Sequence, residues 1–204
     1  MKTVSSSIAV LFFSYLLGAV PFGYIIARFK TGRDIRAMGS GNIGATNVSR
    51  SVGKWWGRLV LILDILKGFI PPVVAFVFTR DERVVVLSGF LSVIGHMFPI
   101  YIGFKGGKGV ASGLGALLGI SIVYHIVALG LLFFILTWFF VHRIFGYVSL
   151  ASISGALAFG IFGVLLFPDI WLKIFALLLA IFVVWRHKSN IVKLIKGKEV
   201  RSGL

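Results

Sequence analysis

Long apolar runs alternate with short polar connections along the whole chain. A transmembrane helix needs about 20 mostly apolar residues, and runs near that length occupy residues 5–27, 57–79, 84–102, 110–141, 147–167 and 169–185. The pattern predicts an all-α fold, a polytopic integral membrane helix bundle.

The run at residues 110–141 is too long for a single span. At about 1.5 Å per residue it would extend about 48 Å, whereas the hydrocarbon core of a bilayer is about 30 Å thick. We therefore divide it near Gly119 to Tyr124 into a short span and a full one, which gives seven transmembrane helices. A single long, tilted helix is the alternative and would leave six.

The basic residues predict the orientation. Residues 28–58 hold seven Lys and Arg against one acid, Asp34, which places this connection in the cytoplasm and the N-terminus outside. The basic tail at 186–201 is then cytoplasmic only with seven spans. The first run is too long for the apolar core of a signal peptide, and its basic cluster follows it. Since no repeat or linker divides the chain, we expect residues 1–204 to form one domain.

The composition limits the classes of partner that the protein could bind. The 204 residues are 58% hydrophobic, carry a formal net charge of +15 and include no cysteine. This excludes a disulfide framework, a Cys-based zinc site and a thiol nucleophile. Because the charges lie in short connections, there is no basic domain that could read nucleic acid. Membrane lipid headgroups and phosphorylated small molecules remain as anionic partners.

The first polar constellation lies at residues 39–50. Its three glycines allow backbone N–H groups to converge, four neutral side chains add polar contacts, and Arg50 adds a bidentate cation, a combination that suits a phosphate. The residues concerned are Gly39, Ser40, Gly41, Asn42, Gly44, Thr46, Asn47 and Arg50. A flexible polar loop is the alternative.

The same glycines satisfy the G-x-G-x-x-G spacing of dinucleotide-binding loops, with Asp64 at the distance of a ribose-binding acid. That motif belongs to a βαβ unit, whereas here it follows a predicted span and Asp64 lies inside the next one. We therefore reject a dinucleotide site.

The second constellation, residues 103–109, precedes the predicted short span. Lys105, Gly106, Gly107 and Lys108 resemble a P-loop, although the spacing is one residue short and no Ser or Thr follows the lysine. Glycines, lysines and a following helix N-terminus nevertheless favour phosphate binding. Lysines that only orient the protein in the membrane are the alternative.

Further polar residues stand in or beside the spans. His187 and Asn190 share a face if their segment is helical, although this tail could simply be attracted to anionic lipid. Asp64 and Lys67 form either a structural ion pair or a support for the site. His96 is either a ligand contact or an interfacial histidine.

Taken together, these motifs resemble the bacterial membrane glycerol-3-phosphate acyltransferases of the acyl-phosphate-dependent type. The matching segments are GSGNIGATNVSR at 39–50, LDILKG at 63–68, HMFPIYIGFKGGKGVAS at 96–112 and HKSNIVKLIKGKE at 187–199. The sequence departs slightly from the expected pattern, with Ser112 in place of Thr and Lys193 in place of Arg.

The resemblance implies transfer of an acyl group from acyl phosphate to the sn-1 hydroxyl of glycerol 3-phosphate, at the cytoplasmic face of the bacterial inner membrane. It requires neither a cofactor nor a metal. The catalytic residues expected are Ser40, Lys105, Lys108, His187 and Asn190. Substrate binding is expected of Gly39, Gly41, Asn42, Thr46, Asn47, Arg50, Gly106, Gly107, His96 and Glu199.

Two alternatives remain open from the sequence. The soluble-type acyltransferase pattern of His, four residues and Asp is missing at all four histidines, so either the leaving phosphate or His187 accepts the proton. The competing function is a transporter or channel for phosphate or an organophosphate, which few ionisable residues in the spans and the lack of an inverted repeat disfavour.

Overall fold

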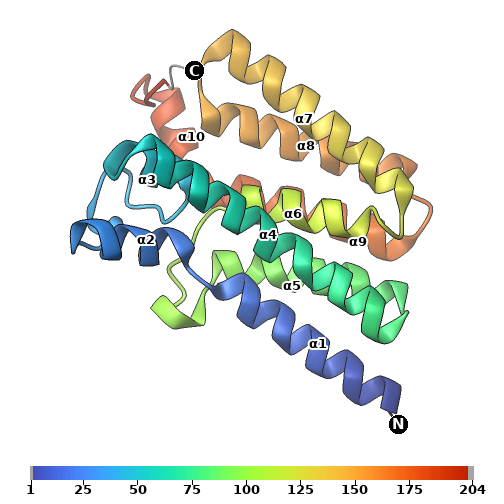
Figure 1. The fold of residues 1–204 in the computed structure, drawn as a ribbon. Helices are drawn as coiled ribbons and strands as arrows, with labels where there is room; N and C mark the ends of the chain where they lie inside the picture. Colours follow the sequence, from blue (N-terminus) through green and yellow to red (C-terminus); the bar gives the residue numbers. More distant parts are fainter. Residues whose placement is uncertain (1, 202–204) are drawn as a thin grey trace. The chain divides into compact units, whose positions relative to one another are not determined.

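The structure is a computed structural model that describes residues 2–201, and every regular element in that range is a helix (Figure 1). The predicted all-α fold is therefore confirmed for the described part of the chain. The chain forms two compact units, residues 1–120 and residues 121–204. The predicted single domain over 1–204 also includes residues 1 and 202–204, which lie outside the described range, and it stays a prediction.

In the described residues, the first unit contains three long helices and several shorter ones. Its elements are α1 (Lys2–Ala19), α2 (Phe22–Thr31), η1 (Ile35–Ala37), α3 (Ala45–Ser51), α4 (Lys54–Thr79), α5 (Glu82–Met97), η2 (Ile100–Ile102) and α6 (Val110–Ile120). The carboxylate of Asp81 caps the start of α5 by accepting hydrogen bonds from the N–H groups of Arg83 and Val84, at 2.9 and 3.4 Å.

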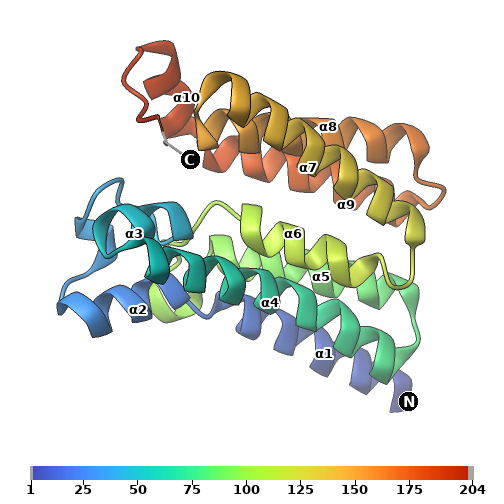
Figure 2. The ribbon, with the colours of Figure 1, turned by 45° about the horizontal axis from the view of Figure 1, so that its top comes forward.

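Small residues bring the helices of the first unit close together. A Cβ atom on Gly115 of α6 would overlap the carbonyl oxygen of Ile65 in α4, and one on Gly68 of α4 would overlap that of Ser112 in α6. The pair α1 and α5 meets in the same way at Gly18 and Ser92. Figure 2 shows the backbones of these helices side by side. Close contact stabilises membrane helices through dispersion, because lipid supplies no hydrophobic driving force for helices to associate.

The second unit is a smaller helical bundle. It consists of α7 (His125–Phe145), α8 (Val148–Leu166), α9 (Ile170–Arg186) and the short α10 (Lys188–Ile195). Asp169 caps α9 through bonds from the N–H groups of Trp171 and Leu172 at 2.8 and 3.2 Å. α9 and α10 are bent by 57° at His187.

The predicted division of the long apolar run is confirmed, because α6 ends at Ile120 and α7 begins at His125. The predicted first span at residues 5–27 falls within one candidate span, Val4–Thr31, that has a local break. The helix is interrupted between Ala19 and Phe22. Pro21 explains the break, since it lacks an N–H group and disfavours the helical conformation of the residue before it.

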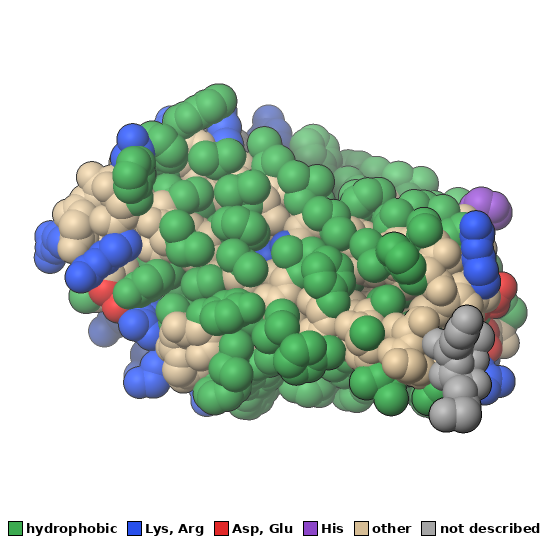
Figure 3. Space-filling model, turned by 60° about the horizontal axis from the view of Figure 1, so that its bottom comes forward, with side chains coloured by type: hydrophobic (Ala, Val, Ile, Leu, Met, Phe, Trp, Pro, Cys, Tyr) green, Lys and Arg blue, Asp and Glu red, His purple; other side chains and the backbone are tan. Residues whose placement is uncertain are grey.

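Helix length supports a membrane bundle. In the described chain, five helical segments are long and apolar enough to cross a bilayer, and the bent pair α9–α10 makes a sixth, whereas α6 has only 11 residues. Figure 3 shows one face on which hydrophobic side chains cover the middle while Lys and Arg lie toward the ends. Lipid is the solvent that tolerates such a surface. The predicted number of seven spans stays a prediction.

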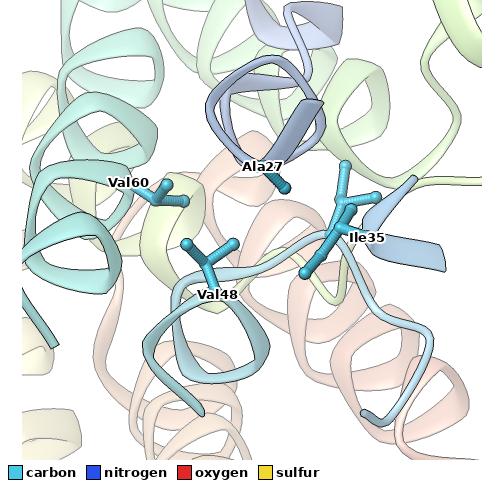
Figure 4. Close-up of a cluster of buried hydrophobic side chains, with 5 residues drawn as sticks. Ala27, Ile35, Val48 and Val60 are labelled. Carbon is cyan, nitrogen blue, oxygen red and sulfur yellow. The ribbon is translucent and has the colours of Figure 1, made fainter. Parts of the chain in front are cut away.

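A small hydrophobic cluster in the first unit fixes the polar connection between α2 and α4. Ala27 of α2, Ile35 of η1, Val48 of α3 and Val60 of α4 pack together with Ile43, and all five are buried (Figure 4). Burying a side chain of this size contributes about 1.5–3 kcal/mol. The cluster therefore anchors the ends of the first glycine-rich loop on the helices that flank it.

Candidate active site

The first loop, residues 38–47, is shaped by the buried side chain of Asn47. Its Oδ1 accepts a hydrogen bond from the N–H of Ser40 at 2.9 Å. Its Nδ2 donates to the carbonyl oxygens of Asn42 at 2.8 Å, Met38 at 3.0 Å and Ile35 at 3.3 Å. Since these bonds engage both ends of the amide, Asn47 holds the loop in shape, and the substrate contact predicted for it stays a prediction.

Two glycines of this loop are required by its backbone. Gly39 and Gly41 have φ values of +53° and +72°, in the left-handed region that side chains disfavour. A Cβ on Gly39 would also overlap Oδ1 of Asn47. The loop and the helix α3 that follows it thus present Ser40, Thr46 and Arg50 as exposed side chains, the hydroxyls and the guanidinium that the sequence predicted for a phosphate.

A salt bridge ties this connection to the segment after α5. The guanidinium of Arg36 donates to both oxygens of Asp34, from Nε at 3.1 and 3.0 Å and from Nη2 at 2.7 Å, and Nη1 donates to the carbonyl oxygen of Ile102 at 3.0 Å. Ile102 ends η2, directly before the second glycine-rich loop. The two loops are therefore joined within the first unit.

The same salt bridge lowers the pKa of the Asp34 carboxyl. The hydrogen bonds from Arg36 lower the pKa of the Asp34 carboxyl below its ordinary value of 3.8. A depressed carboxyl pKa means that the pair's contribution to stability is complete above that ordinary value and is lost only as the pH falls through the lowered pKa. The tether between the loops therefore persists at neutral pH.

The second loop, residues 103–109, lies against the end of α5. The N–H of Gly107 donates to the carbonyl oxygen of His96 at 3.0 Å. A Cβ on Gly106 would overlap that same oxygen, and one on Gly109 would overlap Cε of Met97. Gly106 and Gly107 are buried, whereas Lys105 is exposed and Lys108 half-buried. The glycines thus serve contact with α5, and the lysines carry the charge outward.

The predicted ion pair between Asp64 and Lys67 is present and buried. Nζ of Lys67 lies 2.8 Å from Oδ1 of Asp64 and donates to the carbonyl oxygen of Val20 at 2.7 Å. His96 is 3% exposed, with Nδ1 at 3.6 Å from the same Asp64 oxygen. The imidazole is therefore packed inside the first unit, and its predicted contact with substrate stays a prediction.

In the second unit, His187 and Asn190 are both buried at the bend between α9 and α10. Nδ1 of His187 lies 2.7 Å from the carbonyl oxygen of Val183. Because a carbonyl only accepts, Nδ1 is the donor of this hydrogen bond. The ring orientation is thus set by the last turn of α9.

Glu199 organises the same end of the second unit. Its Oε1 accepts hydrogen bonds from Nδ2 of Asn190 at 2.7 Å and from Oγ of Ser149 at 2.8 Å. The carboxylate therefore links α10 to the start of α8. Sequence reasoning predicted Glu199 as a substrate contact and missed Ser149, which lies 50 positions away and carries no local signal.

The predicted site residues thus fall into two groups. The first unit gathers those of the two glycine-rich loops and His96, and the second unit gathers His187, Asn190 and Glu199. Sequence reasoning also missed the Asp34–Arg36–Ile102 tether, because the acceptor is a backbone carbonyl 66 positions from Arg36.

Apolar helices of bilayer length, small-residue helix contacts and polar glycine-rich connections define a helical integral membrane protein. The sequence profile of a family described as glycerol-3-phosphate acyltransferase matches residues 8–197. The chain therefore belongs to the glycerol-3-phosphate acyltransferase family of enzymes, as its motifs indicated.

Individual relatives support the same family assignment. A glycerol-3-phosphate acyltransferase of Aquifex aeolicus (strain VF5) is 43% identical over 190 residues, covering 93% of this chain and 95% of that protein. One from Prochlorococcus marinus (strain MIT 9215) is 40% identical over 195 residues, covering 95% and 96%.

Two crystal structures of PlsY (YgiH), an integral membrane glycerol 3-phosphate acyltransferase, share the fold. The glycerol 3-phosphate form gives a TM-score of 0.87 at 41% identity, and the lysophosphatidic acid form gives 0.83 at 39%. Both comparisons cover 97% of this chain and 96% of the other.

Proposed function

We propose that this protein transfers a fatty acyl group from acyl phosphate to the sn-1 hydroxyl of glycerol 3-phosphate, giving lysophosphatidic acid and phosphate. The site would face the cytoplasm of a bacterial cell, at the inner membrane. The main support for this proposal is the pair of tethered polar segments in the first unit. One presents Ser40 and Arg50, and the other presents Lys105 and Lys108. Family membership favours this activity over transport of an organophosphate.

The charges match the substrates. Acyl phosphate and glycerol 3-phosphate each bring a phosphate group, and the loops supply a guanidinium for bidentate contact and two ammonium groups for electrostatic attraction. PlsY has been crystallised in glycerol 3-phosphate and lysophosphatidic acid forms. These are one acceptor and one product of the proposed reaction.

In the proposed chemistry the glycerol hydroxyl attacks the acyl carbonyl. A carbon–oxygen ester bond forms, the bond between the acyl carbon and the phosphate oxygen breaks, and the hydroxyl proton passes to the departing phosphate. Lys105 and Lys108 would stabilise the negative charge that develops on the leaving group. Ser40 would orient a substrate by hydrogen bonding.

The local structure of His187 supports a binding role over a general base. Its Nδ1–H donates to a neutral backbone carbonyl, which stabilises an imidazolium less than a carboxylate partner would. Asn190, held by Glu199, lies one turn away in the same bend.

Purified protein tests the function directly. It should convert acyl phosphate and glycerol 3-phosphate into lysophosphatidic acid with release of inorganic phosphate. Acyl-coenzyme A and acylated carrier protein, supplied in place of acyl phosphate, should give no product. Product from either thioester donor would contradict the proposed donor, and no product from any donor would contradict the proposed enzyme.

Loss of loop charge should separate catalysis from folding. We expect Arg50→Ala and Lys108→Ala each to lower kcat/KM by about tenfold or more, because a charge-assisted contact to phosphate is lost. Lys54→Ala, at the exposed start of α4, is the matched control and should keep turnover. Melting temperatures in detergent should agree among the three, and normal turnover of both loop variants would count against the site.

A further inference from the structure

Three buried ionisable side chains form a cluster next to the second glycine-rich loop. Asp64 and Lys67 of α4 and His96 of α5 are each at most 3% exposed. Oδ1 of Asp64 lies 2.8 Å from Nζ of Lys67 and 3.6 Å from Nδ1 of His96. Buried ionisable groups in a membrane protein are costly and mark functional positions by default.

The cluster connects elements that are distant in the sequence. Nζ of Lys67 also donates to the carbonyl oxygen of Val20, at the break between α1 and α2. His96 occupies the last turn of α5. Lys67 therefore links the break in the first helix to the carboxylate of Asp64, and the end of α5 lies beside that carboxylate.

The other edge of the imidazole faces Gly107. A Cβ atom on Gly107 would overlap Nε2 of His96 and would lie 2.7 Å from Cε1 and 2.9 Å from Cδ2. The φ of Gly107 is not in the left-handed region, so an alanine there would meet the imidazole but no backbone strain. The backbone N–H of Gly107 also donates to the carbonyl oxygen of His96.

We propose that His96, oriented by Asp64, is a positioning residue that sets the backbone of Gly106 and Gly107. In this way it fixes where Lys105 and Lys108 meet the phosphate of the substrate. The inference rests on the proposed function and assigns His96 a task other than direct substrate contact. Burial of the imidazole between Asp64 and Gly107 supports this, since both ring edges face the protein itself.

A double-mutant cycle tests the proposal. Gly107→Ala should lower kcat/KM by about a hundredfold, because a displacement of about 1 Å at a reacting group can cost that much. His96→Asn keeps a donor near Asp64 but removes the ring edge at Gly107, and it should raise the KM for a phosphate substrate about tenfold. In the double variant the alanine methyl group enters the vacated space.

The proposal expects strong non-additivity. The double variant should lose no more activity than His96→Asn alone, instead of the roughly thousandfold loss that independent effects would give. Multiplied losses would overturn the proposal. The proposal would also be overturned if the two substitutions were coupled in their effect on melting temperature while kcat and KM of the folded variants stayed normal. The contact would then be merely structural.

Two further measurements test whether the variants fold and whether the effect is specific to His96. If a single variant does not fold, recovery of folded, active protein in the double variant supports the proposal and failure to recover overturns it. His142→Gln is the matched control, since His142 is also buried but stacks on Trp138 in α7 at 4.9 Å, and it should keep normal KM. Wild-type activity establishes the function whatever the cycle shows, whereas inactive wild-type protein overturns both.

Discussion

At the scale of single residues, the first loop shows how much one side chain can organise. The Asn47 amide donates hydrogen bonds to the carbonyl oxygens of Ile35, Met38 and Asn42 and accepts one from the N–H of Ser40. An amide with both ends engaged is a poor candidate for a ligand contact, although its type and place in the motif suggested one. The exposed residues around it are the better candidates.

Replacement of Asn47 should therefore act on the loop. We expect Asn47→Ala to lower stability by about 1–3 kcal/mol, since the N–H of Ser40 and three carbonyl groups lose their partner. It should also reduce kcat, because Ser40 loses its anchor. Thermal unfolding in detergent and steady-state assays measure the two effects. Ser51→Ala is the control, because its hydroxyl makes only a long bond of 3.4 Å to Asn47.

His187 offers a test of the proposed chemistry. If the imidazole only binds substrate, His187→Asn should raise the KM for glycerol 3-phosphate and keep measurable turnover at saturation. Single-turnover acyl transfer across pH distinguishes this from general base catalysis. Loss of the chemical step together with the acidic limb of the rate profile would identify His187 as the base and exclude proton transfer to the leaving phosphate.

At the scale of elements, the short helix α6 depends on its neighbour. Its 11 residues cannot cross a bilayer alone, and its glycines place it directly on the backbone of α4. We expect Gly115→Ala to lower stability by about 1–3 kcal/mol, because the added methyl group meets the carbonyl oxygen of Ile65. Thermal unfolding measures this, with Leu118→Ala on the exposed side of α6 as the control.

The elements also show what a sequence can and cannot predict here. The apolar runs predicted the helices, and the thickness of the bilayer predicted the division between Ile120 and His125. The tasks of the loop glycines were not predictable in this way. Their spacing suggested close approach to a phosphate, which stays a prediction, and it gave no sign that Gly106 and Gly107 also pack against the end of α5. Contacts between distant segments, such as Ser149 with Glu199, leave no periodic pattern to detect.

At the scale of the whole molecule, charge and hydrophobicity together predict the arrangement in the membrane. The basic connections are at 28–58 and 186–201, and the charge-balanced segment 80–83 holds the turn between α4 and α5 and Glu82 at the start of α5. With seven spans, both basic segments lie in the cytoplasm. Each unit carries one of the two groups of predicted site residues.

Cysteine labelling can check this orientation, because the chain has no cysteine of its own. Single cysteines at Ser40 and Lys198 should react with a membrane-impermeant reagent only from the cytoplasmic side, and one at Glu82 only from outside. All three positions are exposed. Labelling of position 198 from outside would show that the number of spans is even.

The contact between His96 and Gly107 also limits how the family can diverge. Adding a side chain at 107 while histidine remains at 96 creates an overlap, and shrinking the histidine first leaves a gap beside the loop. A lineage that changes one position is therefore expected to change the other soon afterwards. Relatives with alanine or serine at the position of Gly107 should carry a smaller residue than histidine at the position of His96, and the two sites should vary together across the family tree.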